Sequence, residues 1–119
     1  MDHPESLTDK CFIFDGLNWN PAQTLPTPIS EAGFTSHPDW GLVMTGGEVT
    51  DDMNVYSKSV IQIKGAGSDP KFLPELLEAN TYGCLVALDK KRLFLGGGRL
   101  NTGSSPQTHS RKVMLALIN

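Results

Sequence analysis

Short apolar segments alternate with turn-forming residues along the whole chain. The segments are rich in aromatic and β-branched residues, and glycine, proline, asparagine or aspartate separate them. This pattern is typical of β-strands joined by turns. We expect strands near residues 11–14, 40–45, 58–63, 82–88, 92–95 and 112–118, with weaker strands at 32–35 and 72–73. The only helical candidate, residues 74–80, is too short to be stable alone, so the pattern predicts an all-β fold.

Two pairs of glycines give the chain a repeat. Gly46-Gly47 and Gly96-Gly97 each end an apolar strand and lie fifty positions apart, and Gly33 and Gly83 have the same separation. A fixed period of this length indicates a repeat architecture. A unit of about 50 residues built from short strands favours a blade of a β-propeller, a four-stranded antiparallel sheet.

The strand order predicts about two blades in all, made of parts of three. Strands of one type occur at 12–14, 60–63 and 113–117, so the chain begins late in one blade, completes a second and stops late in a third. Residues 1–10 are polar and are expected to form a disordered lead-in to a repeat region at 11–119. Propellers close with about four to eight blades. The region is therefore interpreted as a fragment of a larger propeller that needs further blades or self-association.

The order of residues within the repeat resembles the kelch repeat. Phe14 ends an aromatic strand, Trp19 follows, and a proline-rich link leads to the strand that ends in Gly46-Gly47. Phe72 stands where a second tryptophan would be expected. The resemblance implies a partial kelch-type β-propeller. It also implies a non-catalytic role in protein–protein interaction or as a scaffold, with a protein partner of unknown identity.

The residue types at the repeat positions have a physical basis. Glycine lets two backbones approach where a side chain would not fit, and a large aromatic such as Trp19 can bury apolar area at the seam between blades. The residues assigned to the structural repeat are Trp19, Gly33, Gly46, Gly47, Gly83, Gly96 and Gly97.

Charge and composition limit the kinds of partner and cellular compartment that we expect. The formal net charge is −3, and no basic stripe is present, so nucleic acid is not an expected partner. No apolar run approaches the roughly 20 residues that span a bilayer. Residues 1–10 do not resemble a signal peptide, which predicts a cytoplasmic protein as the chain stands, or an extracellular one if its true beginning is missing. Cys11 and Cys84 do not form a disulfide framework.

Several groups of residues could carry chemistry, and none has a convincing pattern. His3, His37 and His109 share no metal-ligand spacing, Ser104 and Ser105 lack a nucleophile-elbow pattern, and residues 96–99 do not open a helix as a phosphate loop does. Asp51 and Asp52 with Glu48 could bind a cation weakly, but a solvated loop is preferred. We therefore expect no catalytic residue, no cofactor and no metal site.

Two other interpretations stay open at this point. The chain could be a fragment of a secreted propeller enzyme similar to galactose oxidase, in which imidazoles and tyrosines would converge on copper. It could also be a small independent β-sandwich whose periodicity is accidental. The protein-binding propeller is the primary hypothesis because the glycines, the tryptophan and the spacing agree with one another.

Overall fold

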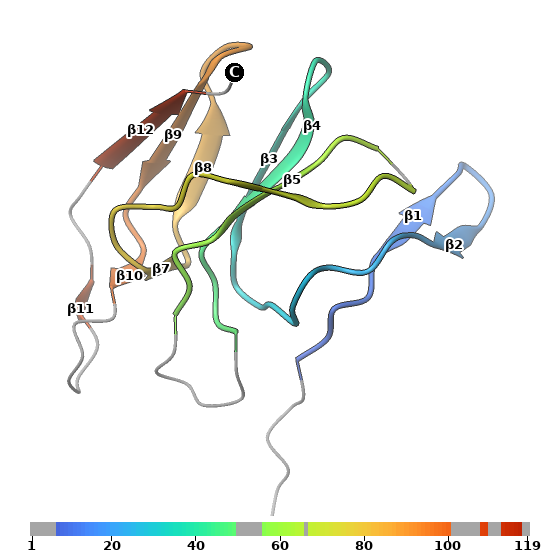
Figure 1. Ribbon diagram of the computed structural model, residues 1–119, viewed down its shortest axis with the longest axis horizontal. Helices are drawn as coiled ribbons and strands as arrows, with labels where there is room; N and C mark the ends of the chain where they lie inside the picture. Colours follow the sequence, from blue (N-terminus) through green and yellow to red (C-terminus); the bar gives the residue numbers. More distant parts are fainter. Residues whose placement is uncertain (1–6, 50–55, 66, 101–107, 110–112, 118–119) are drawn as a thin grey trace, which may run out of the picture.

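The computed structural model describes residues 7–49, 56–65, 67–100, 108–109 and 113–117 (Figure 1). All regular secondary structure in these ranges is β, so the predicted all-β class is confirmed. The strands form four antiparallel sheets, one of four strands, two of three and one of two. In the part of the chain that is described, no helix is long and apolar enough to cross a membrane.

The four-stranded sheet lies in the middle of the molecule, and its strands pair in chain order (Figure 1). The strands are β3 (Gly33–His37), β4 (Gly41–Thr45), β5 (Val60–Ile63) and β6 (Lys71–Leu73). All four residues of β5 are buried, because the strand is central and its β-branched side chains pack on both faces. The outer strand β6 is largely exposed, as expected of an edge.

Two further sheets follow the four-stranded sheet along the chain. The larger pairs β8 (Cys84–Ala87) with β9 (Arg92–Gly96) and β9 with β12 (Val113–Leu117). The smaller joins β7 (Asn80–Thr81), β10 (Arg99–Leu100) and β11 (Thr108–His109). Strand β7 precedes β8 in the chain, and β10 and β11 lie between β9 and β12. The smaller sheet therefore lies at one end of the larger one (Figure 1).

The remaining sheet is a hairpin before the four-stranded sheet. It pairs β1 (Phe12–Phe14) with β2 (Trp19–Pro21). The link after β2 is attached to the loop between β5 and β6 through Gln23, whose amide donates to the Gly65 carbonyl at 2.9 Å and accepts from the Gly67 amide at 3.0 Å. The hairpin is thereby held beside the four-stranded sheet.

The β1–β2 hairpin, the four-stranded sheet and the β8–β9–β12 sheet repeat one strand pattern. Hairpin β1–β2 corresponds to β5–β6, because the link after each makes the same backbone bonds: Leu25 to Asp9 at 2.7 Å, and Leu76 to Lys58 at 2.8 Å. Strands β8, β9 and β12 correspond to β3, β4 and β5 in their antiparallel order. The predicted division into the end of one unit, a complete second unit and most of a third describes this strand order, and the six main strands lie within two residues of their predicted bounds.

The backbone repeats every 51 residues through β3–β4 and β8–β9, one residue more than predicted. Glu31 and Tyr82, 51 positions apart, are the two described non-glycine residues with positive φ, each at 60°. Gly33 pairs with Thr45 in the first unit, and Cys84 pairs with Gly96 in the second. The equivalence of Gly33 with Gly83 is therefore wrong by one residue, because Gly83 occupies the position of Ala32.

The same correction applies to the diglycines. Gly46 and Gly47 have φ of 67° and 92°, and Gly97 and Gly98 have φ of 71° and 87°, whereas Gly96 is the last residue of β9. A side chain at Gly47 would lie 2.6 Å from the Ser30 carbonyl oxygen. A side chain at Gly98 would lie 2.5 Å from the equivalent oxygen of Thr81. Gly97-Gly98 is thus the counterpart of Gly46-Gly47, and both sites exclude a Cβ for the same reason.

The core lies between the four-stranded sheet and the β8–β9–β12 sheet. Strands β3 and β8 pack against each other at this junction. A Cβ at Gly33 would lie only 3.2 Å from the Cβ of Leu85, so glycine allows the two strands their close approach. The buried side chains of this cluster are Trp40, Val43, Val60, Leu85, Leu93 and Leu95, flanked by Leu73, Leu76 and Ala87.

Four further local predictions need correction. Trp19 is 70% exposed, and its ring centroid lies 5.3 Å from that of Phe14 in the same hairpin, so it does not fill a seam between the described sheets. The strand predicted at 82–88 begins at Cys84, because the positive φ at Tyr82 interrupts an extended backbone. Residues 99–111, where the sequence pattern predicts no strand, contribute the short strands β10 and β11. The expected lead-in already contacts the fold at Thr8, whose carbonyl accepts from the Ile29 amide at 3.3 Å.

Candidate functional site

The two ends of the sheets carry different kinds of polar residues. We call the end with the hairpin turns at 37–41 and 88–92 the turn end, and the end with Gly46-Gly47 and Gly97-Gly98 the glycine end. In Figure 1 the turn end lies at the top of the middle and left-hand sheets, and the glycine end lies below.

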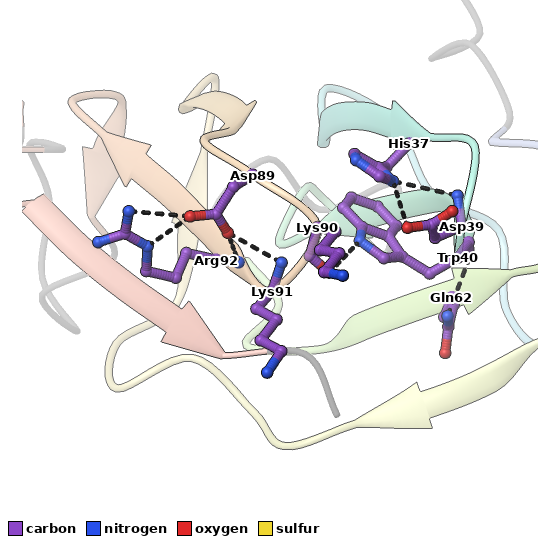
Figure 2. A network of polar contacts seen from close by, with 8 residues as sticks. All are labelled: His37, Asp39, Trp40, Gln62, Asp89, Lys90, Lys91 and Arg92. Atoms are coloured by element: carbon purple, nitrogen blue, oxygen red, sulfur yellow. Dashed lines mark hydrogen bonds and ion pairs between the residues drawn. The ribbon is translucent and has the colours of Figure 1, made fainter.

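At the turn end, Trp40 joins the two hairpin turns (Figure 2). Its indole N–H donates to the Lys90 carbonyl at 3.0 Å, across to the turn of the next unit. Its own carbonyl accepts from the buried Gln62 amide at 2.9 Å. His37 stacks on the indole with 5.3 Å between centroids, and its Nδ1 accepts from the Asp39 amide at 3.0 Å. These groups satisfy one another, which is the expected arrangement for a structural joint.

Asp89 closes the adjacent turn through hydrogen bonds made within the turn itself (Figure 2). Its carboxylate accepts from the backbone amides of Lys91 and Arg92 at 2.9 and 2.8 Å. The guanidinium of Arg92 also donates to it, at 2.9 Å from Nε. These bonds, first of all the one from the Lys91 amide, hold the pKa of Asp89 below its usual value. The carboxylate is fully used in shaping the turn.

At the glycine end, five residues from both units form what we call the glycine-end cluster. They are Glu31, Glu48, Tyr56, Tyr82 and Arg99. Glu48 follows the first diglycine, and its backbone bridges to both Ser30 and Tyr56. Arg99 follows the second diglycine and pairs with Thr81 in the small sheet.

The positive φ of Glu31 and Tyr82 brings the two units together at this cluster. The Tyr82 amide donates to the Glu31 carbonyl at 3.0 Å, and the Thr81 hydroxyl donates to the same oxygen at 2.9 Å. The Arg99 guanidinium lies 5.0 Å from the centre of the Tyr82 ring, within the range of a cation–π interaction. The four positions at 31, 48, 82 and 99 are thus two equivalent pairs, Glu and Glu in one unit and Tyr and Arg in the next.

Two polar atoms of the cluster are buried without a partner among the described residues. Tyr56 is 7% exposed, and its hydroxyl makes no hydrogen bond of good geometry. The Oε2 oxygen of Glu31 is also buried and makes none. Buried polar atoms in folded proteins are nearly always hydrogen-bonded. The glycine end therefore differs from the turn end, where the polar groups described above are hydrogen-bonded to one another.

The electrostatics of the cluster agree with its geometry. Burial, and next the charge of Glu31, raise the pKa of Glu48, while Arg99 opposes the rise. Burial, followed by the charge of Glu48, raises the pKa of Tyr56. Arg99 acts in the other direction, by its charge and by an approach to the Tyr56 hydroxyl that falls short of a well-aligned hydrogen bond. A hydrogen bond between the Tyr82 hydroxyl and the Glu31 carboxylate is the first cause of the raised pKa of Tyr82. The cluster thus contains two carboxylates and one guanidinium, and burial is the first cause of the raised pKa of both Glu48 and Tyr56.

The residues predicted from sequence fall unevenly on this site. Gly46 and Gly47 border it, whereas Trp19 lies in the first hairpin and Gly96 within β9. His37 belongs to the turn end, and His109 lies in β11. Among the described residues, no three His, Cys, Asp or Glu side chains could hold a metal ion, and Cys11 and Cys84 are both free. His3, Asp51, Asp52, Ser104 and Ser105 lie outside the described residues.

Sequence reasoning missed the glycine-end cluster as a unit. A signal was present, because Glu48 and Arg99 each come directly after a diglycine and so occupy equivalent places. The predicted period of fifty residues concealed it, since that register aligns Glu48 with Gly98.

No protein-family profile matches the chain, and no curated protein matches it significantly. The kelch resemblance therefore stays a prediction.

Proposed function

We propose that this chain is a segment of a kelch-type β-propeller that serves as a non-catalytic protein-binding or scaffold module. The observation that supports the proposal is the 51-residue backbone repeat, in which equivalent glycines meet equivalent carbonyls in consecutive sheets. Repeat units bury their apolar faces on one another, and the β3–β8 junction has that character.

The outer sheets carry apolar residues that need covering. In the first hairpin, Phe12, Phe14 and Trp19 are all more than half exposed. In β12, Val113 and Leu115 are exposed, the latter at 64%. Contiguous exposed apolar surface marks an interaction site or an aggregation liability. In a propeller these faces would pack against further blades, and in isolation they favour self-association.

Sedimentation of the purified chain tests this proposal. We expect wild-type protein at tens of micromolar to sediment as oligomers or aggregates, and the double variant Phe14→Ser/Trp19→Ser to shift toward smaller species. Leu17→Ser is the matched control, because Leu17 is 86% exposed in the turn of the same hairpin and lies outside its strands. A wild-type monomer with a sharp thermal transition would contradict the proposal and support a self-sufficient β-domain. Stoichiometric copper in the purified protein would instead support the oxidase alternative.

A further inference from the structure

We propose that the glycine-end cluster binds a cationic side chain, arginine or lysine, of a partner protein. The inference deepens the proposed function and rests on it. It starts from the two buried atoms without a hydrogen-bond partner among the described residues, the Tyr56 hydroxyl and Glu31 Oε2.

These two atoms set the chemistry of the missing partner. A carboxylate oxygen only accepts hydrogen bonds, and a phenol oxygen can accept one. The complementary group must therefore donate. Guanidinium and ammonium groups are donors without acceptors, and their bonds to a carboxylate are about twice as strong as neutral ones. A neutral amide would also bring an acceptor oxygen, and the cluster offers fewer donors for it than acceptors.

Charge favours the same kind of group. The cluster holds two carboxylates, Glu31 and Glu48, and one guanidinium, Arg99, which lies beside the Tyr82 ring. A second cation would offset the repulsion between the two carboxylates, whereas an anion would add to it. A phosphate or an acidic peptide is therefore excluded by the same residues that attract arginine or lysine.

The cluster lies partly at the surface. Tyr82 is more than half exposed, and Glu31, Glu48 and Arg99 are only partly buried. Glu31 Oε2 and the Tyr56 hydroxyl lie beneath this surface, so a partner side chain reaches them only when the side chains that cover them shift. Aromatic faces favour such a cation as well. A partner residue would then contact both units of the repeat at once.

Saturation-transfer NMR provides the test, because it observes the ligand and tolerates self-association of the protein. The probes are N-acetyl-arginine amide and N-acetyl-lysine amide, with N-acetyl-citrulline amide as the uncharged analogue of arginine. We expect transfer to at least one cationic probe and little to citrulline. Glu31→Gln should weaken binding about tenfold or more, as expected for loss of one partner of a charge pair.

Tyr56→Phe removes only the hydroxyl, keeps the packing of the ring, and should weaken binding about tenfold, the size of one hydrogen bond to a charged group. Glu75→Gln is the control, because Glu75 is exposed in the link after β6. Equal transfer to citrulline, or unchanged binding in Glu31→Gln, would overturn the cation site. Self-association through Phe14 and Trp19 involves neither residue, so that result would leave the proposed function standing.

Discussion

The turn end and the glycine end join the same two repeat units by opposite means. At the turn end, Trp40, Gln62 and Asp89 satisfy their polar groups within the fold. At the glycine end, backbone contacts bring the units together, while Tyr56 keeps a buried hydroxyl without a partner among the described residues. Satisfied groups stabilise a fold, and unsatisfied buried groups cost stability unless a ligand completes them. In the function proposed above, the turn end therefore provides stability and the glycine end provides recognition.

The largest expected effect is at the turn end, from Trp40→Ala. Trp40 is 5% exposed in the core and donates to Lys90 in the next unit, so its removal leaves a cavity and cuts a bond between turns. We expect a loss of about 3–5 kcal/mol in the free energy of unfolding, the usual cost of truncating a buried tryptophan. Chemical denaturation followed by circular dichroism measures it.

Trp19→Ala is the matched control for that experiment. Trp19 contacts mainly Phe14 and is mostly exposed, so its loss should cost less than about 1 kcal/mol. Equal losses for the two tryptophans would contradict the distinction between a joint at Trp40 and an open surface at Trp19.

Three adjacent glycines provide the next test, because each meets a different environment at the glycine end. An alanine Cβ at Gly98 would lie 2.5 Å from the Thr81 carbonyl oxygen, and φ there is 87°. Gly97 has a similar φ of 71° but open space around it, and Gly96 would meet only the side chains of Phe94 and Val113. We expect Gly98→Ala to cost about 3 kcal/mol or more. Gly97→Ala should cost about 1–2 kcal/mol from its backbone conformation alone, and Gly96→Ala the least.

This series also discriminates between the two registers of the repeat. With the fifty-residue period, Gly96 and Gly97 would be the counterparts of Gly46 and Gly47, and Gly98 would be dispensable. Thermal unfolding of the three alanine variants ranks them directly. A tolerated Gly98→Ala together with a damaging Gly96→Ala would overturn the 51-residue equivalence.

These cases show which parts of the fold could be predicted from sequence. Strands such as 60–63 and 113–117 were predictable, because apolar runs between turns depend on local composition. The exact period was not, because three consecutive glycines fit two registers, and only the positive φ values decide between them. The two tryptophans were equally ambiguous. Each directly follows a turn, and whether its side chain is buried depends on the neighbouring sheet, which local sequence does not specify.

The candidate site was hidden for a related reason. Its residues come from five separate places in the chain, and two of them meet only because Glu31 and Tyr82 adopt an uncommon backbone conformation. No spacing rule connects Glu48 with Tyr82. The carboxylates therefore looked like ordinary solvated charges until the two units were placed side by side.

The smallest expected effect compares one carboxylate from each end as pH changes. Asp89 has a lowered pKa, so its contribution to stability is present above its unfolded value near 3.8 and is lost as pH falls through the folded pKa. Glu48 has a raised pKa, so its ionisation costs stability as pH rises from its unfolded value near 4.5 through the folded pKa. Asp89→Asn should therefore destabilise the protein at pH 7, and the destabilisation should diminish as pH falls below about 3.8.

Glu48→Gln should do the reverse, because the amide removes a charge that the folded state disfavours. We expect it to stabilise the protein at pH 7 by about 0.5 kcal/mol, the size of partly exposed electrostatic interactions, and to have no effect near pH 3, where wild-type Glu48 is protonated. Urea denaturation of both variants at the two pH values gives the comparison. Destabilisation by Glu48→Gln at pH 7 would mean that Arg99 more than compensates the carboxylate. The glycine end would then be a satisfied structural joint like the turn end, and it would have no excess negative charge with which to attract a cation.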